Sequence, residues 1–487
     1  MVVVAYFAVL AVLALWGLER ALLGLNALRP TPQVMTSKAR PQVLVQLPLF
    51  NERTVAERLL QATDRLVWPR DRLRVQVLDD STDDTRLIVD RWAELLRARG
   101  LQIEVCRRSG RDGYKAGALA HGLKAAPEEP FVAIFDADFI PGPDFLVRTM
   151  GAFGDPEVGL VQARWTHLNR DESWLTRAQA VFLDGHFGVE HAGRQARGAP
   201  FNFNGTAGVW RRRAIEAAGG WSGDTITEDL DLSFRAQMVG ARFVYAHGVE
   251  TPAELPNSMS AFRTQQARWV RGSAQTARKL LPRIWRAPRL SFGFRWAATL
   301  HLATNFTYVF MAALALLLPW AVVLRDQQGW RVVGGQALLS GLDLASLGAG
   351  TLAMLMFYAI GLGRCGVGGW RRWVDVPWAL CLGAGLSWSN AREVLRGLGR
   401  QDRVFVRTPK RGEGRGSYSA PLVRHGWELL LAAYHGVAAG YAIVQGLWGA
   451  IPFLLMYAIG FGAIAVGSLR EAAQARSKSP SPQPETA

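Results

Sequence analysis

The sequence predicts an α/β domain with a doubly wound sheet, followed by an α-helical transmembrane domain. Between residues 41 and 255, short apolar segments with strand character alternate with helical segments, which is the pattern of a largely parallel sheet. After residue 296, apolar stretches long enough to cross a bilayer recur. The chain has 487 residues, so it has room for both parts.

The chain is strongly basic, with a formal net charge of +16. Such a charge attracts nucleic acids, anionic lipid headgroups or anionic substrates. The long apolar segments favour membrane lipids, because Lys and Arg concentrate on the cytoplasmic side of membrane proteins. No nucleic-acid recognition motif is visible, so no nucleic-acid partner is expected. The three cysteines are far apart in sequence, which argues against a disulfide scaffold or a structural zinc site.

The first element is the uncharged apolar stretch from Val2 to Leu18. A cleaved signal peptide would carry Lys or Arg before the apolar stretch and a small-residue cleavage site after it, and neither is present. We therefore interpret residues 1–28 as a membrane anchor, whose helix can continue past Glu19 and Arg20. A short Pro-containing linker begins at Arg29.

Four strands are expected in the first half of the α/β domain, separated by helices near 55–66, 88–98 and 118–125. The strands are 42–47, 73–78, 101–106 and the apolar run that starts at Phe131. Three of them end in polar or acidic residues. Because open α/β sheets bind ligands at the carboxyl ends of their strands, these residues predict a nucleotide-binding cleft.

The fourth strand ends in Asp136-Ala-Asp138, between Pro130 and Pro141. Two aspartates at a strand end are common in solvated turns and helix N-caps. They can also hold a divalent cation, which can neutralise a diphosphate. The pattern alone leaves both interpretations open.

The second half of the α/β domain continues the same alternation. It predicts a strand at 159–165, a helix at 176–190, a small-residue loop at 201–210 that enters a short helix, and a strand at 242–246. Thr227 is placed to cap a helix that starts with acidic residues, which suit the helix dipole. His167 and His186 have no obvious partner, and we interpret both as structural.

The membrane part starts with a basic amphipathic segment at 256–292, which we interpret as interfacial helices. A partner-binding helix or a plain surface helix is the alternative. Spans are expected at 297–324, 337–362, 429–448 and 451–466, within a membrane domain of residues 296–470. The stretch 374–390 is short and flanked by arginines, so an interfacial or re-entrant helix is expected there. Residues 471–487 are expected to be a disordered tail.

Four motifs occur in a fixed order along the chain. They are Asp79-Asp80, Asp136-Ala-Asp138, Thr227-Glu228-Asp229 and Gln265-Gln-Ala-Arg268-Trp269. Together they resemble the D, D-x-D, T-E-D, Q-x-x-R-W signature of membrane-embedded family 2 glycosyltransferases of the cellulose synthase-like and mannan synthase-like type. The resemblance implies a Rossmann-like, GT-A-type nucleotide-sugar-binding domain. It also implies inverting transfer of a hexose from UDP-glucose or GDP-mannose to the end of a β-linked glucan, mannan or glucomannan, with coupled export.

The resemblance assigns donor and metal contacts. Asp136 and Asp138 would hold Mg²⁺ or Mn²⁺ against the diphosphate. Lys115 lies in a Gly-flanked turn and would reach a phosphate, although an ordinary surface lysine is the alternative. Arg268 would pair with the diphosphate. The expected nucleoside contacts are Phe50, Glu52, Asp79 and Asp80.

The resemblance also assigns the proton chemistry and the acceptor contacts. Asp229 would be the general base that deprotonates the acceptor hydroxyl, whereas a helix cap is the structural alternative. Trp269 would stack on a sugar ring, or instead anchor the helix at the membrane interface. The other expected acceptor contacts are Phe203, Asn204, Gly205, Thr206, Glu228 and Gln265. For residues 203–206 the resemblance is partial, and a tight structural turn is the alternative.

The segment from Phe405 to Lys410 resembles the F-x-V-T-x-K gating loop of cellulose synthases, within a basic loop near 400–416. It departs from that pattern at Arg407, which leaves the gating mechanism open. Thr408 and Lys410 are expected phosphate contacts, and binding of anionic lipid is the alternative.

Other functions remain open at this point. A non-processive glycolipid synthase of the ceramide or sterol glucosyltransferase type resembles the same signature, and a nucleotide-regulated transporter belongs to a different class. Expected partners are a nucleotide-sugar donor, a growing glycan or glycolipid acceptor, membrane lipids, and a separate regulatory or export protein. The expected location is the bacterial inner membrane, with the catalytic domain in the cytoplasm.

Overall fold

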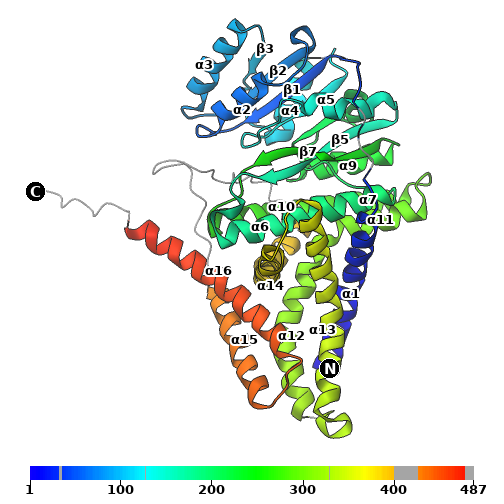
Figure 1. The fold of residues 1–487 in the computed structure, drawn as a ribbon, viewed down its shortest axis with the longest axis vertical. Coiled ribbons are helices and arrows are strands. Elements are labelled where there is room, and N and C mark those ends of the chain that lie inside the picture. The colour runs from blue at the N-terminus through cyan, green and yellow to red at the C-terminus, as the bar shows by residue number, and fades with distance from the viewer. Residues whose placement is uncertain (32–33, 35, 127, 328–329, 400–425, 478–487) are drawn as a thin grey trace, which may run out of the picture.

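The computed structural model describes the chain except for residues 32–33, 35, 127, 328–329, 400–425 and 478–487 (Figure 1). The α/β domain occupies one end of the molecule, and long apolar helices occupy the other. Helices α6 (Trp174–Gly185), α7 (Ala192–Ala196), α10 (Met259–Arg286) and α11 (Phe292–Leu302) lie between the two parts. The predicted two-part architecture is confirmed.

One seven-stranded sheet organises the α/β domain, in the order β3-β2-β1-β4-β6-β5-β7. Strands β1, β2, β3 and β4 are mutually parallel, as predicted. The strands are β1 Val43–Leu49, β2 Leu73–Asp79, β3 Gln102–Cys106, β4 Phe131–Ile134, β5 Val158–His167, β6 Gly208–Arg211 and β7 Arg242–Ala253.

Strand β6 corrects the expectation for residues 201–210. The sequence predicts a loop that enters a short helix, but Gly208–Arg211 forms a strand antiparallel to both β4 and β5. Val209 and Trp210 are fully buried, because β6 is an interior strand between β4 and β5. The short helix follows as α8 (Arg212–Ala217). The sheet is therefore mixed rather than uniformly parallel.

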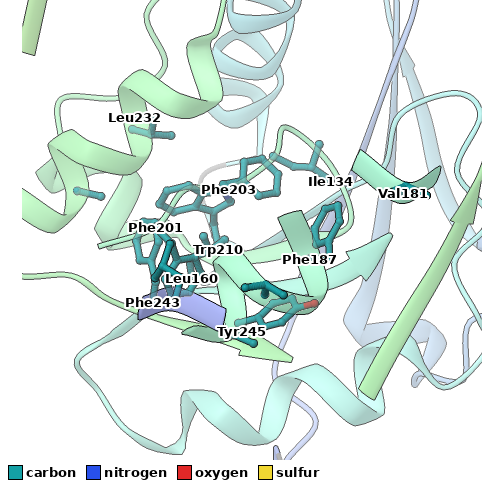
Figure 2. Packing of buried hydrophobic residues seen from close by; sticks show 14 of the residues in the cluster. Ile134, Leu160, Val181, Phe187, Phe201, Phe203, Trp210, Leu232, Phe243 and Tyr245 are labelled. Carbon is teal, nitrogen blue, oxygen red and sulfur yellow. The ribbon is translucent and has the colours of Figure 1, made fainter. Parts of the chain in front are cut away.

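Helices cover the sheet and bury its apolar faces. On the first half of the domain these are α2 Ala56–Asp64, α3 Thr85–Ala98, α4 Tyr114–Ala125 and α5 Phe145–Thr149. The helix predicted at 176–190 is α6, which continues into a π-helical segment, His186–His191, before α7. An aromatic cluster that includes Phe187, Phe203, Trp210 and Tyr245 packs in the adjoining core (Figure 2).

Among the residues that the structure describes, five helices have the length and hydropathy of membrane spans. They are α1 Val2–Ala27, α12 Thr307–Gln327, α13 Trp330–Arg364, α15 Gly426–Val444 and α16 Ile451–Ser477. Residues 297–302, which we expected in the second span, belong to α11. A 3-10 turn, Thr304–Phe306, separates that helix from α12. Because this turn interrupts the helix, α11 can run in a different direction from α12.

Helix α14 (Arg371–Leu398) is not among these candidate spans. It is seen nearly end-on in Figure 1, so it lies across the direction of α12 and α13. This arrangement agrees with the expected interfacial helix at 374–390. The expected tail beginning at residue 471 is corrected, because α16 remains helical to Ser477.

A buried ion network joins α1 to the α/β domain. The Glu190 carboxylate lies 2.9 Å from Arg20 and 3.4 Å from Arg194, and Arg194 also pairs with Glu19 at 2.8 Å. The carboxylate further contacts His301 at 3.1 Å. Because these charges are almost completely buried, each depends on its partners. Helix α1 therefore continues past Glu19 and Arg20 as part of the folded assembly.

Candidate active site

A cleft of about 130 Å³ opens at the carboxyl ends of β1, β2 and β4. Helix α4 and helix α10 complete its walls. Eight of the predicted site residues line it. They are Phe50, Glu52, Asp80, Lys115, Asp136, Asp138, Gln265 and Arg268. The cleft thus combines residues that are more than 200 positions apart in the chain.

The part of the cleft formed by Phe50 and Asp80 contains one cation–π contact and one acid–arginine pair. The guanidinium of Arg111 lies 3.2 Å from the centroid of the Phe50 ring, a cation–π arrangement. Asp80 accepts from Arg108 Nε at 3.0 Å. Arg108 and Arg111 were missed by the sequence analysis. The signal was the arginine-rich run that directly follows β3 and precedes the turn at Gly113.

Asp79 does not face this cleft, which corrects its predicted contact with the nucleoside. Its side chain is fully buried, and it accepts from Arg107 Nε at 2.9 Å and from the Ser81 backbone at 3.0 Å. Asp79 is the last residue of β2 and Asp80 begins the loop after it, and only the Asp80 side chain is among the lining residues of the cleft. Asp79 holds the loop after β2, and Asp80 lines the cleft.

Lys115 connects the cleft to the acidic motif of α9 (Glu228–Met238). Its ammonium group lies 2.5 Å from Asp136 Oδ1, donates to the Gly205 carbonyl at 2.9 Å, and lies 4.0 Å from Glu228. Gly205 has φ +84°, and a Cβ atom there would lie 3.0 Å from Asp229 Oδ2. Lys115 is therefore an internal cation between two acidic motifs, which argues against an ordinary surface lysine.

Asp136 and Asp138 follow β4, as predicted, and both line the cleft. Among the residues that the structure describes, no group of three or more His, Cys, Asp and Glu side chains is arranged to hold a metal ion. Two carboxylates still fit a cation that arrives with a nucleotide, since Mg²⁺-type sites use one or two carboxylates together with substrate phosphates. The donor set is oxygen only, which suits Mg²⁺ or Mn²⁺.

Asp229 lies at the start of α9, half-buried beside Glu228. Burial and the neighbouring Glu228 carboxylate raise the pKa of Asp229 to about 7, while Lys115 acts in the opposite direction. A carboxyl group with a pKa near the working pH suits proton transfer. Thr227 occupies the N-cap position, but its hydroxyl makes no capping bond and lies 3.2 Å from the Thr276 hydroxyl of α10. The motif therefore packs on α10 without the expected side-chain cap.

Helix α10 carries Gln265, Arg268 and Trp269, predicted to share one face. Gln265 and Arg268 line the cleft, whereas half-buried Trp269 lies outside its lining residues. Burial lowers the pKa of Arg268, and nearby carboxylates, Glu228 first, counteract that effect. A side chain on Gly272 would clash with Thr227 at 2.5 Å, so the glycine permits the close approach of α10 and α9.

Membrane helices fix the position of α10. Glu471 of α16 accepts hydrogen bonds from the backbone of Met259 and Ser260, the orphan donors of the first helical turn. Arg263 pairs with Glu428 of α15 at 2.5 Å, with both side chains buried. Arg271 pairs with Glu393 of α14 at 2.5 Å. The helix that carries Arg268 is thus held from three sides by the membrane domain.

The loop at 203–206 lies beside the cleft, but three of its side chains are already engaged. Phe203 is fully buried against Trp210. The buried Thr206 hydroxyl accepts from the Asp136 backbone at 2.8 Å. Asn204 contacts both His186 and His191, at 2.8 and 2.7 Å. These placements favour a supporting role for the three side chains over direct acceptor contact.

The histidines interpreted as structural do have partners. His167 contacts Asp184 at 3.0 Å, and His186 contacts Glu190 at 3.0 Å. Fully buried Asp231, interpreted as structural, pairs with Arg235 and Lys279. Thr408 and Lys410, the predicted gating-loop contacts, lie outside the described residues.

Lys115 provides a test of the electrostatic arrangement. Because its charge lowers the pKa of Asp229, replacement by glutamine is expected to raise that pKa and to move the acidic limb of the pH–rate profile to higher pH. The pH dependence of kcat/KM checks this, since it reports the free enzyme. An unchanged limb in Lys115→Gln, with Lys38→Gln outside the cleft as control, would contradict the electrostatic effect of Lys115 on Asp229.

An α/β sheet with an acidic and basic cleft at its strand ends, fused to membrane spans, defines a membrane-bound nucleotide-sugar glycosyltransferase of GT-A fold. The model of the glycosyl transferase family group 2 matches residues 131–324. The chain belongs to glycosyltransferase family 2.

Relatives support this assignment. Glucomannan 4-beta-mannosyltransferase 1 of Oryza sativa subsp. japonica is 46% identical over 283 residues, 56% of this chain and 53% of that protein. Glucomannan 4-beta-mannosyltransferase 2 of Arabidopsis thaliana is 46% identical over 260 residues, 52% of this chain and 48% of that protein. The chain spans about half to two thirds of the length of the curated relatives it matches.

A solved structure shows the same fold. The mannosyltransferase PcManGT from Pyrobaculum calidifontis, in complex with GDP-Man and Mn²⁺, matches with a TM-score of 0.53 at 22% identity. The match covers 75% of this chain and 98% of that one. At this identity the likeness concerns the fold, and it confirms the predicted GT-A architecture.

Proposed function

We propose that the protein transfers mannosyl units from GDP-mannose to the end of a β-1,4-linked mannan or glucomannan chain. The observation that carries this proposal is the 46% identity to two plant glucomannan 4-beta-mannosyltransferases. It favours mannose over glucose as the transferred sugar, which the sequence motifs leave open. The membrane spans favour a product that leaves through or along the membrane part.

In the proposed reaction, the acceptor hydroxyl attacks the anomeric carbon of the donor from the face opposite the diphosphate. Asp229 takes the hydroxyl proton, the new glycosidic bond forms, and the bond to the diphosphate breaks with inversion. Phe50 and Asp80 hold the nucleoside, and Arg268 pairs with the diphosphate oxygens. Trp269 and Gln265 bind the acceptor sugar at the membrane side of the cleft.

Asp136 and Asp138 would hold Mg²⁺ or Mn²⁺, which offsets the charge of the leaving diphosphate. Asp136 is paired with Lys115 in this structure, so Lys115 neutralises the carboxylate before the donor arrives. Glu52 borders the same cleft and would contact the nucleoside end. The proposed division of roles places the metal on the strand-end aspartates and the proton on α9.

We place the α/β domain on the cytoplasmic side, because the basic helix α10 lies at that end of the spans. The curated relatives named above come from plants. They give no support to the expected bacterial inner membrane, so the proposal specifies the cytoplasmic face of a membrane and not its source. Glycan acceptors and a separate export partner remain part of the proposal.

The test is a comparison of labelled GDP-mannose, GDP-glucose and UDP-glucose in membranes that contain the protein, with Mn²⁺ or Mg²⁺, followed by linkage and size analysis. We expect a long 4-linked product from GDP-mannose. A product of one sugar on a lipid would contradict the polymerase function and establish the glycolipid alternative. No transfer from any donor, with folded protein confirmed, would contradict both.

A further inference from the structure

A second cavity, of about 550 Å³, lies away from the active-site cleft, where the α/β domain meets the membrane helices. Its volume falls within the roughly 300–1,000 Å³ typical of small-molecule sites. Its walls come from α5, β7, the end of α13 and three described residues after α1, Thr31, Val34 and Thr36. The lining residues are Thr31, Val34, Thr36, Arg148, Ala246, His247, Gly248, Val249 and Arg364.

The lining of this cavity is cationic. Arg148 and Arg364 contribute two guanidinium groups, and none of the lining residues that the structure describes is Asp or Glu. Arg148 donates to the Gly248 carbonyl at 2.6 Å, and Arg364 donates to the Thr31 hydroxyl at 2.5 Å. Both contacts are with uncharged oxygen atoms. Asp144 forms an exposed ion pair with Arg148 at 3.5 Å and is not among the lining residues; such exposed pairs are weak in water.

Arg364 also carries an unused donor. Its Nε atom is buried and has no hydrogen-bond partner among the described residues. A buried, unpaired donor on a charged group costs free energy, so its retention points to a ligand that accepts from it. The pKa of His247 is lowered to about 4 by its burial and by the positive charges of Arg164 and Arg364. A neutral His247 leaves the two arginines as the charges that a ligand would meet.

The backbone around the cavity is adapted to open a space at the sheet edge. Strand β7 is the outermost strand, and its pairing with β5 jumps from Ala246 to Glu250. His247, Gly248 and Val249 therefore bulge out of the ladder into the cavity wall. Bulges at sheet edges commonly redirect side chains toward a functional site.

The cavity borders the ends of two candidate membrane spans. Arg364 is the last residue of the candidate span Leu347–Arg364, and Thr31 follows the end of α1, another candidate span. Helices α1 and α13 run side by side, and the C-terminal end of each lies at the α/β domain (Figure 1). Trp370 and Trp373 are exposed just beyond α13, and tryptophan is typical of the membrane–water interface.

We propose that this cavity binds the phosphate group of an anionic membrane lipid, with Arg148 and Arg364 as its cationic contacts. Arginine recognises phosphate oxygens through several parallel donors, and the unpaired Nε of Arg364 supplies one of them. Basic pockets beside transmembrane helices suit anionic headgroups, because the acyl chains can remain in the bilayer. The site is independent of the donor cleft and of the proposed reaction.

The test uses the purified full-length protein in detergent and three probes: short-chain phosphatidylglycerol, phosphatidylcholine of the same chain length, and inorganic phosphate. Binding is read as a saturable rise in the thermal unfolding midpoint. We expect phosphatidylglycerol to bind and phosphatidylcholine to have little effect. The double variant Arg148→Gln/Arg364→Gln is expected to weaken phosphatidylglycerol binding by about tenfold or more, because charge-assisted hydrogen bonds are lost.

Two further variants make the outcome decisive. Arg286→Gln removes an exposed charge at the end of α10, outside the cavity lining, and should bind phosphatidylglycerol like the wild type. Thr36→Trp leaves every charge in place and fills the cavity from an exposed position, so it should block binding even if the double arginine variant fails to fold. Wild-type binding in Thr36→Trp would overturn the proposal. An equal rise with inorganic phosphate at the same concentration would overturn the lipid as the source of the phosphate.

Discussion

Asp229→Asn is expected to reduce sugar transfer by about 10³-fold while donor binding stays within a few-fold of the wild type. General-base catalysis contributes about 10²–10⁴-fold, and asparagine keeps the shape of the side chain but cannot take the proton. The measurement is kcat for transfer from labelled GDP-mannose, together with the affinity for the donor. Loss of donor binding in the variant would instead indicate that Asp229 holds the nucleotide.

The same residue sets the pH dependence. The pKa of Asp229 is raised to about 7, so the carboxylate that acts as base is the main form above that pH. We expect kcat/KM to fall as the pH drops through about 7, in proportion to the protonated fraction. The control is Asp224→Asn in the same segment, which is exposed and pairs with Lys279 at 2.8 Å. It is expected to keep the wild-type pH profile.

Asp138→Asn is the second large effect, expected to lower activity by at least about 100-fold at a fixed Mn²⁺ concentration. A cation that stabilises a leaving diphosphate contributes several kcal/mol, and the variant removes one of the two carboxylates that fit it. Asp138 is buried at the end of β4, and asparagine is nearly isosteric, so the fold is expected to persist. The measurement is activity over a Mn²⁺ titration.

The form of the titration separates a metal role from a structural one. If Asp138 holds the cation, the variant needs a higher Mn²⁺ concentration for half-maximal activity, and chelation abolishes activity in both proteins. Activity restored by metal would support ligation. A variant with the wild-type metal requirement and a lower kcat would contradict it. Asp144→Asn, at an exposed position near the same strand, is the matched control.

Much of the fold follows from local patterns. Apolar runs of strand length and of span length are properties of neighbouring residues, so β1–β4 and the five candidate spans were predictable. The order of the four acidic and basic motifs was equally visible. Strand β6 was not predictable, because a segment of four residues is too short to show the periodicity that distinguishes a strand from the start of a helix. Its strand state depends on β4 and β5 on either side.

The candidate site also has residues that the sequence identified and residues that only the structure revealed. The sequence identifies Asp80, Asp136, Asp138 and Arg268, and the structure places all four on one cleft. Which of two adjacent aspartates faces the cleft depends on how β2 is oriented in the sheet, and this selects Asp80 over Asp79. Arg111 contributes because the loop after β3 brings it over Phe50.

The sequence by itself determined the class of protein, since short motifs and apolar lengths are encoded locally. Only the tertiary structure decided how α10 is held. Glu471 binds the backbone of Met259, 212 residues away, and Glu428 pairs with Arg263 across 165 residues. Such pairings form only when distant helices pack and exclude water, because their strength depends on burial and no local pattern records the partner. The same packing sets Lys115 between Asp136 and Glu228.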